Sequence, residues 1–356
     1  MWAEVISSAS CLRRGGATVS KTSFEIQCRE MPTVSVIMPV RNGAAFLPAA
    51  VESLIRQTMP DWELVVAVQP STDDTREIIE DYAVRESRIR ILPVPAAHGG
   101  AAATHALRES RAALIARLDA DDVCHPTRLA LQAGFLGDNP DVLAVGSRIR
   151  EIDIEGKAGR IRCYPTAPAE IAECLVYRNT FAHSTVMFRR EALLSVGAYR
   201  PPFELAEDYD LLLRLSELGP LANLPDALVD YRIHPDQLSS RRKLLLELSA
   251  AVASYLALRR RAGVPEQLLR NVDMRGQALA IVDAETSEVR QLGRGAARMR
   301  AKLVRALRLM GHIERNSAFQ KVGRLLFQSV KLQDWRAVRT TLGVASGIAL
   351  GLGQAR

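Results

Sequence analysis

The chain has 356 residues, of which 48% are hydrophobic and 24% are charged, and its formal net charge is +7. This composition supports a large hydrophobic core and excludes wholesale disorder. The five cysteines show no CxxC or paired histidine spacing, and no run approaches the roughly 18 to 20 apolar residues of a membrane span, so neither a zinc site, a disulfide framework nor an integral membrane protein is predicted.

The N-terminal thirty residues show no sustained hydrophobic period and no long apolar core of a secretory signal. We expect residues 1–30 to be a disordered extension. Because Met31 stands immediately before the first convincing strand, one hypothesis is that translation begins there.

From Val34 onward, short apolar runs alternate with helix-length segments, which is typical of βαβ units and a largely parallel sheet. Strands are expected at 34–38, 62–68, 89–92 and 114–118, and helices at 45–56, 71–85 and 101–110. Ser71 to Asp74 supply the side chains that favour a helix start. The fold class predicted for this half is therefore α/β with helices flanking a central sheet.

The following segments are less regular. Pro126 favours the first position of a helix over 126–136. Strands are expected at 142–145, 147–152 and 184–188, a helix at 207–218 and an extended segment at 228–233. After residue 240 the pattern becomes helical and basic, which predicts a C-terminal helical extension.

Three carboxylates, Asp119, Asp121 and Asp122, follow the strand 114–118 within four residues. Ligands of α/β sheets bind beyond the carboxyl ends of strands, and crowded carboxylates favour a cation such as Mg²⁺ or Mn²⁺ that bridges to a diphosphate. The alternative is a solvated acidic turn. The spacing alone does not decide between the two.

Two further segments carry candidate chemistry. Asp208, in Glu207-Asp208-Tyr209-Asp210, is a candidate general base, although an acid at a helix start also complements the helix dipole. His234 ends an extended run, where a histidine is either structural or a metal ligand beside Asp119 and Asp121.

These pieces together resemble the family 2 glycosyltransferases over roughly residues 33–238. The motifs are Val34-Ser35-Val36-Ile37-Met38-Pro39-Val40-Arg41-Asn42-Gly43, Ser71-Thr72-Asp73-Asp74-Thr75, Asp119-Ala120-Asp121-Asp122, His183-Ser184-Thr185, Glu207-Asp208-Tyr209-Asp210-Leu211 and Tyr231-Arg232-Ile233-His234. The resemblance implies the GT-A fold, a Rossmann-like and mostly parallel sheet, and transfer of a sugar from a nucleotide-diphosphate donor to an acceptor hydroxyl with inversion.

The resemblance also implies roles for individual residues. Asp119 and Asp121 would be the DxD pair that binds Mn²⁺ or Mg²⁺ and the nucleotide sugar, with Asp121 the direct metal ligand and His234 a further metal contact. Asp208 would be the catalytic base. Residues expected to bind the nucleotide sugar are Pro39, Arg41, Gln69, Asp119 and Asp121.

Two positions depart from the family pattern. Val68, Gln69 and Pro70 stand where the family usually has Asp-Asp-Gly, and a Gln69 amide can donate to and accept from a base edge whereas Val68 cannot. Ala103-Thr104-His105 replaces a frequent Ala-Arg-Asn, so one cationic phosphate contact is missing. These departures motivate one alternative, a catalytically inactive relative that binds a nucleotide sugar. A second alternative is a sugar nucleotidyltransferase. A dinucleotide-dependent oxidoreductase fits poorly, because no GxGxxG motif follows a strand.

Residues 241–356 hold 22 Lys and Arg residues against 8 Asp and Glu residues, a surplus of 14 positive charges. Arg294, Arg298, Arg300, Lys302, Arg305 and Arg308 alternate with Met299, Leu303, Val304, Leu307 and Leu309. This pattern predicts either a basic amphipathic segment on an anionic membrane surface or a helical subdomain packed on the core. No nucleic-acid partner is expected.

The predicted organisation is therefore an extension at 1–30, a GT-A catalytic domain at 31–240 and a basic helical region at 241–356. The expected partners are a nucleotide-sugar donor and a glycan or lipid-linked glycan acceptor, as in polysaccharide and cell-envelope biosynthesis. We expect a cytoplasmic location, with peripheral contact to the inner face of the cell membrane.

Overall fold

The computed structural model describes residues 31–96, 99–203, 205–235, 237, 242–266, 274–283 and 295–305. The expected extension at 1–30 lies outside these residues. The described residues from Pro32 onward belong to one compact unit.

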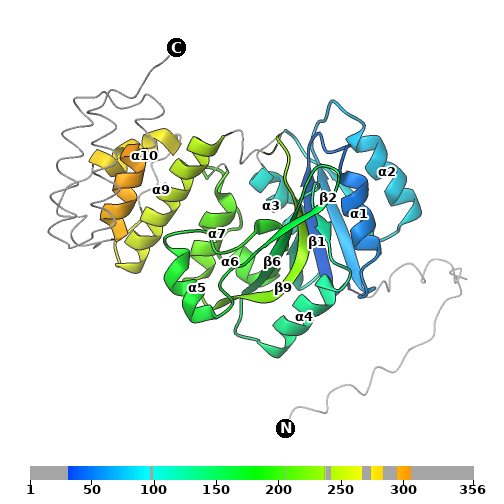
Figure 1. The fold of residues 1–356 in the computed structure, drawn as a ribbon, viewed down its shortest axis with the longest axis horizontal. Helices are drawn as coiled ribbons and strands as arrows, with labels where there is room; N and C mark the ends of the chain where they lie inside the picture. Colours follow the sequence, from blue (N-terminus) through cyan, green and yellow to red (C-terminus); the bar gives the residue numbers. More distant parts are fainter. Residues whose placement is uncertain are drawn as a thin grey trace, which may run out of the picture. The chain divides into compact units, whose positions relative to one another are not determined.

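A single mixed sheet forms the centre of this unit (Figure 1). Among the described residues, its strands follow the order β3-β2-β1-β4-β8-β6-β9-β5, and β7 pairs with β6. The first four neighbours are all parallel: β3 (Ile89–Pro93), β2 (Trp62–Val68), β1 (Val34–Val40) and β4 (Leu114–Arg117). Parallel strands bring their carboxyl ends to the same edge. The predicted α/β class is confirmed.

The remaining strands mix directions. The bounds are β5 Val123–Cys124, β6 Ala144–Ile152, β7 Ala158–Arg162, β8 Met187–Arg189 and β9 Leu221–Arg232. Strand β8 is antiparallel to both β4 and β6, whereas β6 and β9 run parallel over nine partnered residues each. The long β6–β9 pair therefore continues the sheet beyond the parallel half.

Helices cover both faces of the sheet because the side chains of its strands alternate. In β1, Val36 and Met38 belong to one buried cluster and Ile37 to the other. The first cluster includes residues of α1 (Leu47–Ile55), α2 (Thr75–Arg85) and α4 (Arg128–Asp138). The second includes residues of α3 (Gly99–Glu109), α5 (Pro168–Leu175), α6 (Arg190–Ser195), α7 (Glu207–Leu215), α9 (Lys243–Arg261) and α10 (Met274–Asp283).

One predicted helix start is wrong. Helix α4 begins at Arg128, and Pro126 lies before it rather than at its first position. The carbonyl of Pro126 accepts a hydrogen bond from the backbone N–H of Thr58 at 2.9 Å. The buried Arg128 guanidinium donates to the carbonyl oxygen of Arg117 at 2.7 Å. Tertiary contacts therefore set this helix start.

Strand boundaries in the second half also differ from prediction. The segments expected at 142–145 and 147–152 form one strand, β6, and the extended segment expected at 228–233 begins earlier, as β9. The strand expected at 184–188 starts with a 3₁₀ turn, His183–Thr185, before β8. The Thr185 hydroxyl donates to the carbonyl of Ala182 and accepts from the N–H of Ser147, which stabilises this turn.

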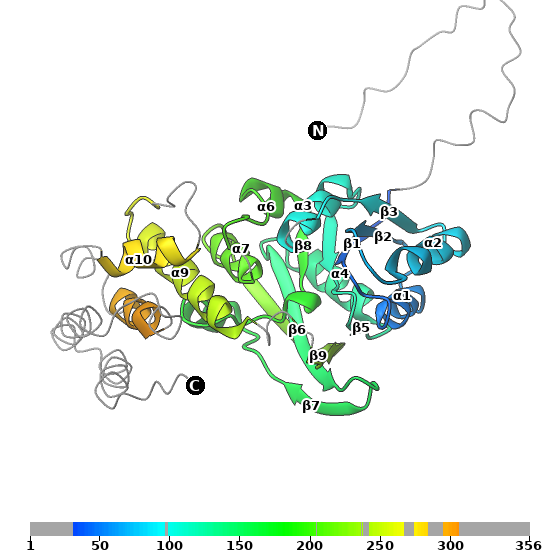
Figure 2. The same ribbon diagram turned by 90° about the horizontal axis from the view of Figure 1, so that it is seen from above.

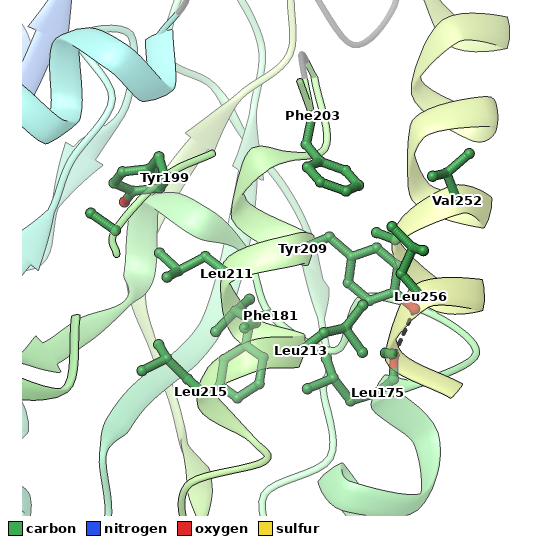
Figure 3. Packing of buried hydrophobic residues seen from close by; sticks show 14 of the residues in the cluster. Leu175, Phe181, Tyr199, Phe203, Tyr209, Leu211, Leu213, Leu215, Val252 and Leu256 are labelled. Atoms are coloured by element: carbon green, nitrogen blue, oxygen red, sulfur yellow. Dashed lines mark hydrogen bonds between the residues drawn. The ribbon is translucent and has the colours of Figure 1, made fainter. Parts of the chain in front are cut away.

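Helix α7 packs directly against α9, and the two lie side by side in both ribbon views (Figures 1 and 2). Figure 3 shows Tyr209 between them, near Val252 and Leu256. The Tyr209 hydroxyl donates to the carbonyl of Leu175 at 2.6 Å and lies 2.9 Å from the Ser254 hydroxyl. A buried polar group is thus fully paired at the centre of an apolar contact.

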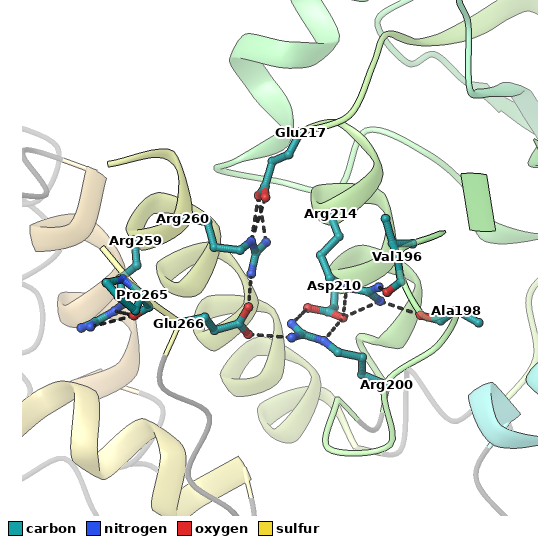
Figure 4. A network of polar contacts seen from close by, with 10 residues as sticks. All are labelled: Val196, Ala198, Arg200, Asp210, Arg214, Glu217, Arg259, Arg260, Pro265 and Glu266. Atoms are coloured by element: carbon teal, nitrogen blue, oxygen red, sulfur yellow. Dashed lines mark hydrogen bonds and ion pairs between the residues drawn. The ribbon is translucent and has the colours of Figure 1, made fainter. Parts of the chain in front are cut away.

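An ion-pair network joins the same elements (Figure 4). Asp210 is fully buried on α7 and accepts hydrogen bonds from Arg200 and Arg214. Arg200 also reaches Glu266 at 2.7 Å, just beyond the end of α9. Arg260 of α9 completes the connection, because its guanidinium lies 2.8 Å from both Glu217 and Glu266.

The helical segment 295–305 packs into the same core. Met299, Leu303 and Val304 are completely buried, and Arg300 donates to the carbonyl of Val282. For these residues the structure agrees with the packed-subdomain alternative, while Arg294, Leu307, Arg308 and Leu309 lie outside the described residues. None of the helices within the described ranges is both long and apolar enough to span a bilayer.

Candidate active site

The acidic loop, Asp119 to Asp122, follows β4 at the edge where the parallel strands end. Because β4 pairs with β1, the N–H of Leu118 donates to the carbonyl of Ile37 and sets the position of the loop beside the end of β1. The hydroxyl of Ser184 accepts from the N–H of Asp119 at 2.8 Å. The loop is therefore tied both to the parallel sheet and to the 3₁₀ turn.

The carboxylate of Asp119 is paired with a neighbouring cation. Arg117, which is buried, donates from Nε to Asp119 Oδ1 at 2.9 Å. Burial raises the pKa of Asp119, but the charge and hydrogen bond of Arg117 together with the charges of His183 and Arg128 outweigh it and hold that pKa below its usual value. Asp119 is therefore a fixed negative charge in the site.

Asp121 faces His234, which lies just beyond β9. The distance from His234 Nε2 to Asp121 Oδ2 is 3.1 Å, and the imidazole packs against Phe46 with ring centroids 5.1 Å apart. Burial and the negative charge of Asp119 raise the pKa of Asp121. The structure thus brings together two of the three predicted metal contacts.

The third acid, Asp122, has a different position. It is buried, and its Oδ1 accepts a hydrogen bond from the N–H of Arg232 at 2.9 Å. Arg232 in turn donates to the carbonyl of Asp121 and stacks over Phe46. The other Asp122 oxygen receives no hydrogen bond from the described residues. Asp122 therefore joins the acidic loop to the end of β9, and no local sequence signal distinguishes it from its neighbours.

The loops after β1 and β2 hold each other in place. The Asn42 side chain accepts from the N–H of Thr72 at 2.9 Å, and Asp73 accepts from the N–H of Ala44 at 3.0 Å. Asn42 itself adopts a positive φ of 50°, which asparagine tolerates better than most residues. Asp73, rather than the N-cap residue Asp74, provides the side-chain contacts at the start of α2.

The predicted nucleotide-contacting residues lie around these loops. Pro39 is half-buried near the end of β1, and Arg41 is exposed just beyond it. Gln69 is buried at the end of β2, where its N–H donates to the carbonyl of Val40. All three occupy the edge of the sheet that also carries the acidic loop.

Asp208 lies in the first turn of α7. Asn179 donates to Asp208 Oδ2 at 3.0 Å. Burial, together with the negative charge of Asp119, raises the pKa of Asp208 to about 6, although the N–H of Tyr209 and the Asn179 amide act in the opposite direction. A carboxyl group with a pKa near the working pH is suited to general-base catalysis.

Glu207 is a site residue for which the sequence assigned no role. Burial raises its pKa to about 7, and the charge of Asp208 adds to the effect. Its Oε2 atom is buried and has no hydrogen-bond partner among the described residues. The side chain lies against α3, because a Cβ atom on Gly100 would come within 2.9 Å of Glu207 Cγ. The adjacent glycines of α3 were the only sequence signal for this close approach.

A cavity of about 710 Å³ connects the acid residues to the C-terminal helices. Asp119 and Asp208 both line it, as does His183, whose pKa burial lowers to about 3. Residues of α9 and of the segment 295–305 also line it. The cavity thus joins residues more than 180 positions apart in the chain.

No cluster of three His, Cys, Asp or Glu side chains with metal-site geometry occurs within the described ranges. Asp121 and His234 form a two-residue group. Magnesium in phosphate-transferring sites commonly takes only one or two carboxylates and completes its shell with substrate phosphates and water. The side chains present fit a cation shared with a substrate, rather than one held by the protein alone.

Comparison with known proteins identifies the family. The Glycosyl transferase family 2 model matches residues 35–197. The O-antigen biosynthesis glycosyltransferase WbnJ of Escherichia coli is 32% identical over 212 residues, which cover 58% of this chain and 82% of that protein. The chain belongs to glycosyltransferase family 2. This glycosyltransferase is also 31% identical to the amylovoran biosynthesis glycosyltransferase AmsE of Erwinia amylovora, over 55% of this chain and 74% of that one.

Solved structures share its fold. S. aureus TarS in complex with UDP-GlcNAc superimposes with a TM-score of 0.57 at 15% identity, covering 90% of this chain and 92% of that one. A mannosyltransferase from Pyrobaculum calidifontis in complex with GDP-Man and Mn²⁺ gives a TM-score of 0.50 at 15% identity, covering 91% and 89%. The predicted GT-A fold is confirmed.

The structure accounts for one departure of this glycosyltransferase from the family pattern. The Thr104 hydroxyl donates to the carbonyl of Gly100 at 3.0 Å, within its own helix. The side chain at this position therefore satisfies a backbone acceptor of α3. His105 is exposed.

Proposed function

We propose that this glycosyltransferase moves a hexose from a nucleoside-diphosphate donor to an acceptor hydroxyl with inversion at the anomeric carbon. The supporting observation is that Asp208, with a pKa of about 6, lines the same cavity as Asp119 of the acidic loop. The proposed base and one acid of the acidic loop thus line one cavity, which supports a single displacement.

In the proposed step, the acceptor oxygen forms a bond to the anomeric carbon while the bond from that carbon to the phosphate oxygen breaks. Asp208 takes the hydroxyl proton, and the bonding electrons leave with the nucleoside diphosphate. Asn179 orients the carboxylate through its 3.0 Å hydrogen bond. Because the carboxylate is largely shielded from water, its ionised form is a stronger base than a solvated aspartate.

The donor is proposed to occupy the edge formed by the loops after β1, β2 and β4. Gln69 would contact the base, and Pro39 and Arg41 would flank the nucleotide. Mn²⁺ or Mg²⁺, when bound by Asp121, would stabilise the negative charge that develops on the diphosphate. His234 would be a further contact of the cation. Asp119 would contact the ribose of the nucleotide or a water bound to the metal.

The experiment is donor turnover with Mn²⁺ by the wild type and by Asp208→Asn. We expect turnover to fall by about 10² to 10⁴-fold, the usual contribution of a general base. A thermal-shift screen of UDP, GDP and dTDP with and without Mn²⁺ should show unchanged nucleotide binding in the variant. Asp226→Asn is the matched control, because Asp226 is exposed on β9.

The alternatives predict other outcomes. Nucleotide binding without turnover of any donor would indicate an inactive relative, as the replacements at Val68 and Thr104 could allow. Release of pyrophosphate from a nucleoside triphosphate and a sugar phosphate would indicate a nucleotidyltransferase. Either result would refute the proposal.

The acceptor is proposed to be a glycan or a lipid-linked glycan, since the relatives named for O-antigen and amylovoran synthesis build polysaccharides. Contact with an anionic membrane surface remains a proposal. Within 295–305 the apolar face is buried in the core, so any such contact would use exposed charges such as Arg305.

A further inference from the structure

The cavity that Asp208 lines also carries a set of cations that the proposed donor chemistry does not use. Arg178, Lys302 and Arg305 line it. Arg178 follows α5, whereas the other two lie on the segment 295–305. We refer to these three residues as the basic wall.

The basic wall is not ion-paired within the part of the chain that the structure describes. Glu247 of α9 lines the same cavity and acts electrostatically on Lys302. No side chain of Asp or Glu in the described ranges, however, lies within the 4.0 Å ion-pair distance of Arg178, Lys302 or Arg305. The basic wall therefore differs from Arg162, another cation of the cavity, which is paired with Glu151.

The arrangement also costs free energy in the absence of an anion. Arg298, Lys302 and Arg305 follow one another at helical spacings of four and three residues, so like charges face each other. Lys302 is half-buried, and burial together with Arg298 lowers its pKa, while Glu247 of α9 partly offsets the effect. A bound anion would relieve this repulsion.

The segment 295–305, which carries Lys302 and Arg305, packs beside Tyr177, the residue before Arg178. Arg298 lies over the ring of Tyr177 at 5.5 Å, and a Cβ atom on Gly295 would come within 3.3 Å of the same ring. Tyr209, next to Asp208 on α7, contacts Ser254 of α9 (Figure 3), and the ion pair of Arg200 with Glu266 joins residues that flank these two helices (Figure 4).

We propose that the acceptor carries an anionic group, a phosphate or a carboxylate, that binds the basic wall while its reacting hydroxyl points toward Asp208. This inference rests on the proposed function. Tyr164, Tyr177 and Tyr231 line the same cavity and would contact the sugar of such an acceptor.

The test uses the full chain, its best nucleotide-sugar donor and three series of octyl glycosides with the same sugars. One series is neutral, one carries a phosphodiester between the sugar and the octyl chain, and one carries a uronate carboxylate. We expect at least a tenfold lower KM for the phosphodiester or the uronate series than for the neutral one. The series with the lower KM identifies whether the anionic group is a phosphate or a carboxylate.

The variant Lys302→Gln/Arg305→Gln should remove this advantage while leaving the KM for the donor unchanged. Arg108→Gln/Lys157→Gln removes two exposed cations outside the cavity and should preserve it. The melting temperature of each variant verifies folding, and the single Lys302→Gln variant should give an intermediate KM.

Equal KM values for neutral and anionic acceptors in the wild type would overturn the inference, as would an advantage that survives in the double variant. Failure of the wild type to turn over any donor, onto any acceptor or water, would refute the proposed function together with the inference.

Discussion

The two halves of the active site are built in different ways. The proposed donor side consists of loops at the ends of β1, β2 and β4, which hold one another through contacts such as Asn42 with Thr72 and Asp119 with Ser184. The proposed acceptor side combines α7, α9 and the segment 295–305 around one cavity. The comparison shows that described helices after residue 240 line the same cavity as Asp208, so we propose that they contribute to acceptor binding.

The boundary predicted at residue 240 marks a change in amino-acid composition, but buried side-chain contacts join the residues on its two sides. Leu213 of α7 and Val252 of α9 belong to the same buried cluster. The ion pair of Arg200 with Glu266 crosses it as well. We accordingly propose that 31–240 and the helices that follow function as one unit.

The largest effect expected on stability comes from removing Asp210. Its replacement by Ala leaves Arg200 and Arg214 without their shared buried partner, which typically costs about 3–5 kcal/mol. Urea unfolding should show this loss, with Asp226→Ala as control. A loss below about 1 kcal/mol would show that the network does not hold the two helices together.

A smaller effect is expected where α3 meets the catalytic helix. Gly100→Ala places a methyl group 2.9 Å from Glu207 Cγ and 3.2 Å from Tyr199 Cβ, and overpacking of this kind costs about 1–3 kcal/mol. Because Glu207 precedes Asp208, we expect kcat to fall more than nucleotide affinity does. Steady-state kinetics with nucleotide titrations would test this; an unchanged kcat would contradict it.

The pH dependence should distinguish the base from the donor-side acids. With a pKa of about 6, Asp208 is protonated below that pH, so kcat should fall about tenfold per pH unit on the acid side. Of the groups around it, Asp119 raises its pKa, whereas Asn179 and the N–H of Tyr209 lower it, and ionised Asp208 in turn raises the pKa of Glu207. Asn179→Ala should therefore move the midpoint to higher pH, and a midpoint that stays in place would argue against Asp208.

The stability of the fold should fall as pH rises, whereas kcat should increase. The folded-state pKa of Asp208 lies above the ordinary value of 3.8, so ionised Asp208 destabilises the fold, and its contribution worsens as pH rises from about 4 to 6. Asp208→Asn should therefore melt at a higher temperature than the wild type at pH 8. The difference should vanish near pH 4, and a constant difference would contradict the assignment.

The smallest effect concerns the face away from the acceptor side. A Cβ atom on Gly134 of α4 would meet nothing within 4 Å. Gly134→Ala should stabilise the protein by about 0.5–1 kcal/mol and leave kcat unchanged, because alanine favours a helix interior. A loss of activity in Gly134→Ala would contradict the expectation that only glycine substitutions near α7, such as Gly100→Ala, lower kcat.

The sequence alone determined the alternation of strands and helices from Val34 onward, the acidic loop after β4 and the acids at the start of α7. These features follow from short-range periodicity and from the rule that ligands bind at the carboxyl ends of strands. It did not predict the helix start after Pro126 or the unbroken strand β6, because hydrogen bonds from distant residues such as Thr58 and Thr185 decide those boundaries.

The tertiary structure alone determined which partner each carboxylate of the acidic loop has. Asp119, Asp121 and Asp122 are indistinguishable by spacing, yet their partners are Arg117, His234 and the backbone of Arg232. The tertiary structure also determined the position of the basic wall. The sequence showed a basic helical pattern but not which cavity these cations line. Charge and burial depend on neighbours brought together by folding, and the partners of Asp121 and Asp122 lie more than 100 residues away in the chain.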